Sequence, residues 1–129
     1  MFFHTDSQSS SPIYVQLIEQ IKELIVKGVL QPGEQLPSVR ELSKQMVVNP
    51  NTVSKAYQEL ERQNVIYSES GIGSFISAPS QQQAAEQQTK QIKNDLRKVM
   101  IDGFYYGIEK ETFQKWIEEI DSEFRRPST

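Results

Sequence analysis

The sequence contains no cysteine and a single histidine, His4, among its 129 residues. A chain without cysteine forms no disulfide and offers neither a thiol nucleophile nor a thiolate metal ligand. With one imidazole, in a polar N-terminal stretch, the usual nucleophile–base pairs and zinc sites are missing too. We therefore expect a protein that is not an enzyme and that has no metal or other cofactor.

Long apolar runs are also missing. No stretch approaches the roughly 20 apolar residues that span a bilayer. The first residues lack the basic segment and the apolar core of a secretory signal. The sequence therefore predicts a cytoplasmic protein with no membrane partner.

The net charge is −3, so the chain lacks the basic excess typical of proteins that hold nucleic acid mainly by charge. The charges are unevenly distributed, however. Between Ser38 and Tyr57 three basic side chains stand against Glu41 alone; these are Arg40, Lys44 and Lys55. One positive face on an otherwise acidic protein is compatible with DNA binding. It predicts that the affinity for DNA depends only weakly on salt concentration.

Two helices are expected in the first third of the chain. Apolar residues recur at helical spacing from Pro12, which suits a first helical position, to Gly28, which suits a helix end. A second helix begins at Ser38, because Ser38 and Glu41 have the spacing of a capping box. It ends before Val47.

A third helix is expected at about 51–63, after a tight turn in which Asn49 is the cap. Two short strands follow, at 65–67 and 74–77. The glycines of residues 69–73 between them are typical of a tight hairpin. This is the one β signal in the sequence.

The pattern divides the chain into three parts. Residues 1–11 are expected to be a disordered arm, because residues 7–11 are too polar to pack. Residues 12–78 form a winged helix-turn-helix, with three helices and a β-hairpin wing. Residues 79–129 begin as a glutamine-rich linker and continue as two helices that Gly107 separates; a disordered glutamine-rich tail is the alternative. The fold class is mostly α.

A short helix, a tight turn and a second helix form the helix-turn-helix arrangement. The second helix fits the major groove, and its first residues face the base edges. Polar side chains at that position can read bases, whereas those at the start of the preceding helix can bind a phosphate. The predicted DNA-binding residues are Ser38, Arg40, Asn49, Asn51, Thr52, Ser54 and Lys55.

Single residues of this set also have simpler explanations. Asn49 can be a helix cap alone. Ser38 is a cap whether or not it also touches phosphate, and Arg40 by itself fits a solvated surface charge. The hypothesis therefore depends on the whole set and on the hairpin that follows it.

The chain resembles the DNA-binding domain of the GntR family in four segments: SPIYVQL at 11–17, GEQLPSVREL at 33–42, NPNTVSKAYQELE at 49–61 and GIGSFI at 71–76. The short two-helix tail and the NPNTV run resemble its smallest, YtrA-like branch. The resemblance implies a homodimer bound to a two-fold-symmetric operator on double-stranded DNA. It also implies a repressor of its own operon and of neighbouring, transporter-type genes.

The same resemblance places the third helix in the major groove and the wing tip at the minor groove. Arg40, Asn51, Thr52 and Lys55 match positions used for DNA contact, and Gly71 matches a wing-tip glycine. The wing departs from the family pattern because it has no basic residue near its glycines. The turn departs too, because Val47 replaces the usual glycine and a β-branched residue resists a left-handed conformation.

The tail is too short for a ligand-sensing domain, and its apolar stripes are too large for 50 residues to bury alone. We expect it to form a homodimer through Leu96, Val99, Phe104, Phe113, Trp116, Ile117 and Ile120. Alternatives are a tail folded back on its own winged helix, or aromatic residues that line a pocket for a small-molecule effector. A protein–protein adaptor is a further alternative, against which the polar start of the third helix argues.

Overall fold

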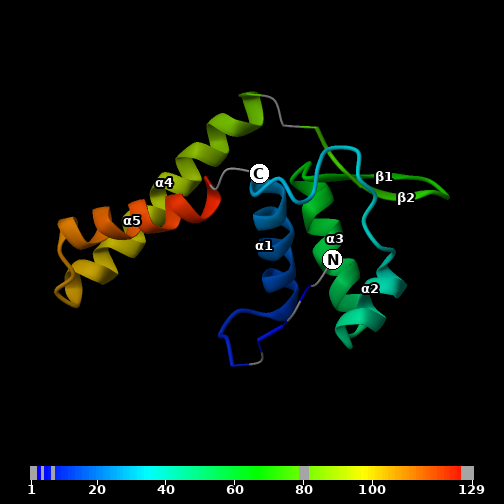
Figure 1. Ribbon diagram of the computed structural model, residues 1–129, viewed down its shortest axis with the longest axis horizontal. Helices are drawn as coiled ribbons and strands as arrows, with labels where there is room; N and C mark the ends of the chain where they lie inside the picture. The colour runs from blue at the N-terminus through cyan, green and yellow to red at the C-terminus, as the bar shows by residue number, and fades with distance from the viewer. Residues whose placement is uncertain (1–2, 4, 7, 79–81, 126–129) are drawn as a thin grey trace. The chain divides into compact units, whose positions relative to one another are not determined.

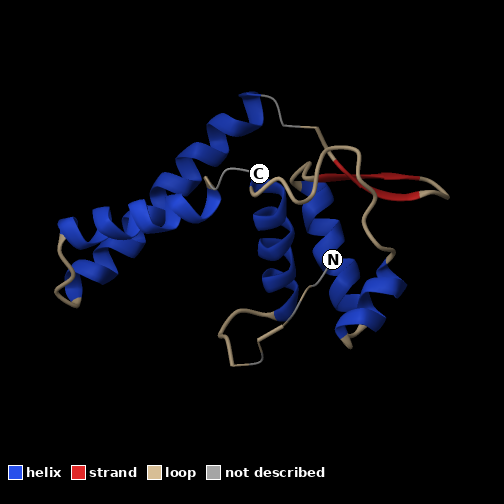
Figure 2. Cartoon of the chain, in the orientation of Figure 1, coloured by secondary structure: helices blue, strands red, loops and turns tan. Residues whose placement is uncertain are grey.

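The computed structural model describes residues 3, 5, 6, 8–78 and 82–125. His4 and the linker residues 79–81 lie outside this part. The chain divides into two compact units, residues 1–80 and 81–129. The first holds three helices and a hairpin, and the second holds two helices (Figure 1). The mostly helical fold class is confirmed (Figure 2).

The first helix, α1 (Ile13–Val26), begins one residue later than predicted, with Pro12 in the cap position. Its buried residues are Leu17, Ile18 and Ile21, one helical turn or less apart. The helix ends at Lys27, and Gly28 follows with a φ of 79°. The apolar stripe read from the sequence therefore does face the core.

The second helix, α2 (Val39–Met46), begins at the predicted capping box. The Glu41 N–H donates to Ser38 Oγ at 3.1 Å, and the Ser38 N–H donates to Glu41 Oε1 at 3.0 Å. The helix ends at Val47, which has the left-handed angles φ 55° and ψ 51°. The turn thus has the left-handed conformation that glycine usually adopts there, and Val47 adopts it at the cost of backbone strain.

The third helix, α3 (Pro50–Arg62), packs against both α1 and α2. Its buried face consists of Val53, Ala56, Tyr57 and Leu60, at helical spacing. The Tyr57 hydroxyl donates to the Pro37 carbonyl oxygen at 2.7 Å. This bond links the middle of α3 to the residue that precedes the α2 cap.

Strands β1 (Ile66–Glu69) and β2 (Gly73–Ile76) form the antiparallel wing, with Ile66 paired to Ile76. The sequence did not predict that the segment before α2 pairs with β2. The Leu36 N–H donates to the Ser74 carbonyl oxygen at 2.8 Å, and the Ile76 N–H donates to the Glu34 carbonyl oxygen at 2.9 Å. The base of the wing is therefore bonded to the chain that leads into α2.

The described residues of the N-terminal arm contact the first unit, and the expectation of a disordered arm stays a prediction. Phe3 is only 9% exposed and belongs to the hydrophobic core of the first unit. The Gln16 side chain pairs with the arm, because its Oε1 accepts from the Asp6 N–H and its Nε2 donates to the Asp6 carbonyl oxygen. The Phe3 side chain and the Gln16 amide thus attach the described part of the arm to the first unit.

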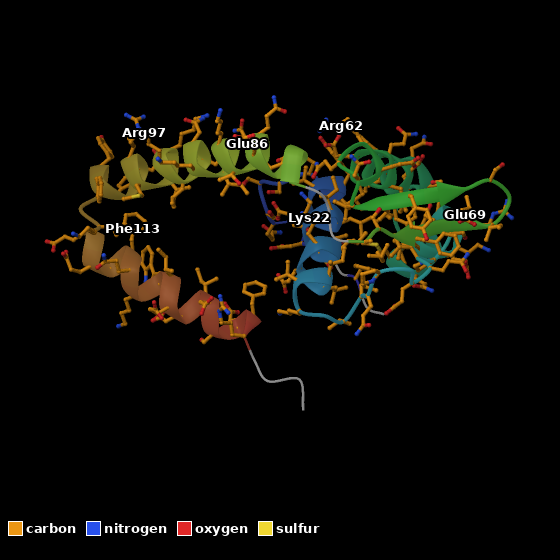
Figure 3. The ribbon with its side chains drawn as sticks, turned by 90° about the horizontal axis from the view of Figure 1, so that it is seen from above. Lys22, Arg62, Glu69, Glu86, Arg97 and Phe113 are labelled. Atoms are coloured by element: carbon orange, nitrogen blue, oxygen red, sulfur yellow. The ribbon has the colours of Figure 1, made fainter. Side chains whose placement is uncertain are left out.

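The second unit consists of α4 (Gln82–Tyr105) and α5 (Lys110–Phe124), joined by a turn at Gly107. Near this turn Phe113, labelled in Figure 3, lies against Gly103, where a Cβ atom would overlap its ring. Phe113 also makes edge-to-face contacts with Phe104 and Trp116. The two helices therefore meet through one small residue and a cluster of aromatic rings.

Among the described residues, no helix is both long enough and apolar enough to cross a membrane. Within the same residues, no group of three or more histidine or acidic side chains is placed to hold a metal ion.

Candidate nucleic-acid interface

The start of α3 is positioned by a short turn and by its own cap. Asn49 Oδ1 accepts from the Asn51 N–H at 2.8 Å, and Pro50 occupies the first turn. Asn49 is thus a helix cap, as predicted. Its amide NH₂ group has no hydrogen bond within the described part of the chain, so it can still donate to a ligand.

Four predicted residues lie on the polar side of α3. Asn51 and Lys55 are exposed, whereas Thr52 and Ser54 are half-buried. The Gln58 amide donates weakly to Ser54 Oγ at 3.5 Å. The structure therefore brings these side chains together within the first two turns of one helix, away from its apolar face.

Lys55 has a contact that the sequence analysis missed. Its Nζ lies 4.1 Å from the centre of the Tyr14 ring, which comes from the first turn of α1. A cation over an aromatic face is attracted by the ring's negative face, by about 0.5–1 kcal/mol at exposed sites. Tyr14 therefore holds the ammonium group beside the polar side of α3. No local pattern in the sequence links these two residues.

The start of α2 supplies a second set of polar groups. The capping hydrogen bonds to Ser38 lower the pKa of Glu41 below its ordinary value, so this carboxylate stays ionised beside the helix start. Arg40 is exposed and forms no ion pair among the described residues. The N–H groups of the first helical residues, Val39 and Arg40, have no acceptor inside the helix.

The wing tip is apolar and acidic. Gly71 has a φ of 77° and lies fully in the open, so its backbone is accessible. Ile72 beside it is 61% exposed. Glu69, labelled in Figure 3 at the end of β1, is the one charged residue of the hairpin from Ile66 to Ile76.

A side chain from outside the hairpin reaches this tip. Gln35 Nε2 donates to the Ile72 carbonyl oxygen at 3.0 Å, across 37 positions in the sequence. This role of Gln35 is not visible in the sequence, because nothing near it in the chain predicts the pairing.

The tail residues predicted to form a dimer are largely uncovered in the single chain. Leu96, Val99 and Phe104 of α4 are about half exposed. On α5, Trp116 is 40%, Ile117 55% and Ile120 52% exposed, whereas Phe113 is half-buried against α4. Apolar surface of this extent is unusual for a chain that acts alone.

Comparisons with known proteins agree with this arrangement. The family described as "Bacterial regulatory proteins, gntR family" matches residues 13–76. The HTH-type transcriptional repressor YtrA of Bacillus subtilis is 46% identical over 93% of this chain and 92% of its own length. Both matches include the helix-turn-helix, and the second also includes most of the tail.

Two solved structures extend the similarity to three dimensions. A transcriptional antiterminator from Listeria monocytogenes EGD-e is 38% identical, with a TM-score of 0.93 over 100% of this chain and 96% of that chain. AraR(DBD) in complex with operator ORE1 is 33% identical, with a TM-score of 0.51 over 57% of this chain and 89% of that chain. The whole architecture and the DNA-binding half thus each have a solved counterpart. This chain belongs to the gntR family of bacterial regulatory proteins.

Proposed function

We propose that this regulator is a dimeric repressor that reads a two-fold-symmetric operator with the start of α3. The observation that carries the proposal is the cluster of polar side chains at that helix start, presented on a buried three-helix core. A domain with the same fold, AraR(DBD), has been crystallised with an operator, which supports DNA as the ligand.

Within the major groove, base reading belongs to the first two turns of α3. Asn51 can pair with adenine through two hydrogen bonds, and the free amide of Asn49 can donate beside it. Thr52 and Ser54 offer hydroxyl groups, and Lys55 can reach guanine or a phosphate. Each good pairing of this kind discriminates against a wrong base by about 1–3 kcal/mol.

Phosphate contacts belong to the start of α2. The positive end of this helix and the N–H groups of Val39 and Arg40 can bind a phosphate beside Ser38. The Ser38 hydroxyl already accepts a capping bond, so its contribution comes from the hydroxyl proton. The Arg40 side chain can neutralise a second phosphate.

The tail brings a second winged helix to the DNA by forming the dimer. Burying the exposed apolar faces of α4 and α5 against a second copy places two winged helices on one duplex. A two-fold pair reads half-sites about one DNA turn apart, which is about 34–36 Å. A protein that sediments as a monomer at micromolar concentration contradicts this part of the proposal.

The regulated genes are proposed from the resemblance and from the relative's description. The Bacillus subtilis relative is described as a repressor, which supports repression here. We propose that the protein acts in the cytoplasm on its own operon and on neighbouring transporter-type genes.

We propose no binding site for a small-molecule effector. The aromatic side chains suggested for a pocket form two separate groups, because Phe104, Phe113 and Trp116 pack together while Tyr105 and Tyr106 contact each other and are exposed. Of these aromatic residues, Phe104 also lines a groove of about 630 Å³ on α4, whose other lining residues include Lys93 and Arg97.

The test is footprinting on the DNA just upstream of the protein's own gene. We expect the wild type to protect a two-fold-symmetric site. Arg40→Ala and Lys55→Ala should weaken protection without unfolding the protein. Lys115→Ala is the matched control, because Lys115 is an exposed lysine of α5. Unchanged affinity in both test variants would refute the assignment of α2 and α3 to the groove.

A further inference from the structure

The wing tip combines an exposed apolar side chain with the absence of any cation. Ile72 is 61% exposed and stands between two glycines, and the hairpin from Ile66 to Ile76 contains no lysine, arginine or histidine. Such a wing cannot bind phosphates by charge. Single exposed apolar residues are common on protein surfaces, so the inference depends on how this one is held.

The tip is held by a side chain of the segment before α2, which pairs with β2. Gln35 Nε2 donates to the Ile72 carbonyl oxygen at 3.0 Å, and the Ile72 N–H donates to the Glu69 carbonyl oxygen at 3.0 Å. At Gly73 a Cβ atom would lie 2.5 Å from Gln35 Nε2, and the φ of +146° also favours glycine. Gly73 therefore leaves the space through which the amide reaches the tip.

The segment that carries Gln35 is fixed at several points. Leu36 is buried, and its N–H donates to the Ser74 carbonyl oxygen of β2 at 2.8 Å. Pro37 accepts the Tyr57 hydroxyl of α3, and the next residue caps α2. The position of the wing tip is therefore set relative to both helices of the helix-turn-helix.

We infer that Ile72 makes an apolar contact in the minor groove and that Gln35 is the positioning residue that holds it there. The inference rests on the proposed DNA binding. Isoleucine is among the apolar side chains that proteins insert between base steps from the minor groove. Because no phosphate is neutralised, this contact adds affinity that does not depend on salt.

The test measures affinity for the footprinted duplex by fluorescence anisotropy at several salt concentrations. Ile72→Ser should lower affinity by about 10-fold at every concentration, because the apolar side chain is no longer buried, and should leave the slope of log K against log salt unchanged. Ile72→Lys should steepen that slope by about 0.9, the value for one added phosphate contact.

The role of Gln35 is tested by a double-mutant cycle. Gln35→Met keeps the length of the side chain but removes the donor, and should cost about 2- to 10-fold in affinity. On the Ile72→Ser background this loss should largely disappear, because both changes then act on the same contact. Gln114→Met, at an exposed glutamine of α5, is the matched control.

Measuring Asn51→Ala in the same assay separates the wing contact from the proposed binding of α3 in the major groove. If Asn51→Ala loses affinity while both Ile72 variants keep the wild-type affinity and slope, the wing inference fails and the proposed function stands. If none of these variants loses affinity, the major-groove assignment fails as well. A Gln35→Met loss that persists in full on the Ile72→Ser background would show that Gln35 does not act through the tip.

Discussion

Replacing Val47 by glycine should stabilise this protein, although it removes an apolar side chain. Val47 adopts φ 55° and ψ 51°, and it is 88% exposed. A non-glycine residue in this left-handed region costs about 1–3 kcal/mol. Glycine removes that cost but loses about 0.4–1 kcal/mol through the greater entropy of the unfolded chain.

Losing the valine side chain costs little folding free energy. A fully buried valine contributes roughly 1.5–3 kcal/mol, whereas one as exposed as Val47 contributes only about 0.3 kcal/mol. The expected net change is about 1 kcal/mol in favour of the folded state. For a unit of this size, that corresponds to a rise in Tm of about 4–8 °C.

Hydrogen exchange of the α3 amides is the suitable assay, because it isolates the first unit from the tail at one protein concentration. Asn64→Gly is the matched control: Asn64 also has a positive φ, of 62°, but asparagine tolerates it. This control should lower stability by about 0.4–1 kcal/mol, because it has the same entropic loss without a comparable strain to relieve. A Val47→Gly variant less stable than the wild type would refute the reasoning.

Three further changes test other parts of the structure. Gly103→Ala would place a Cβ atom in the Phe113 ring. The overpacking cost of about 1–3 kcal/mol should exceed the stability of about 0.5–1 kcal/mol that alanine adds over glycine within a helix. Calorimetry should show a lower Tm, and a higher Tm would contradict the close contact. Ser38→Ala removes the hydroxyl that caps α2 and should cost about 1 kcal/mol in urea unfolding; an unchanged free energy of unfolding would speak against the capping box. By NMR the pKa of Glu41 should rise only in part, because the backbone N–H of residue 38, the larger cause of its lowering, is kept. Hydrogen bonds from the Arg62 and Gln63 side chains lower the pKa of Glu59 from 4.5 to about 2, so its stabilising contribution is present above pH 4.5 and is lost as pH falls toward 2. Glu59→Gln should flatten the fall of Tm over that range, and an acid profile identical to that of the wild type would contradict this.

The features that the sequence predicted well depend on residues close together in the chain. The Ser38–Glu41 capping box spans three positions, and the Asn49 cap acts on Asn51. The strain at Val47 was also predictable, because the identity of one residue decides it. Local hydrogen bonding and backbone sterics are the physics that a sequence pattern encodes most directly.

The features that the sequence did not predict depend on long-range packing. Phe3 lies in a stretch of polar composition, yet it is buried in the core. Gln35 reaches the wing tip across 37 positions, and Tyr14 meets Lys55 across the α1–α3 pair. Such contacts depend on where helices cross, which no local pattern specifies.

The polar start of α3 is central to this account, and binding-site selection from a pool of random duplexes tests it most directly. The wild type should enrich an inverted repeat whose half-sites lie about 10 base pairs apart, centre to centre. Asn51→Ala should enrich the same repeat with the preference lost at one position of each half-site. No enriched repeat, or an identical preference in the variant, would contradict the claim that α3 reads the operator.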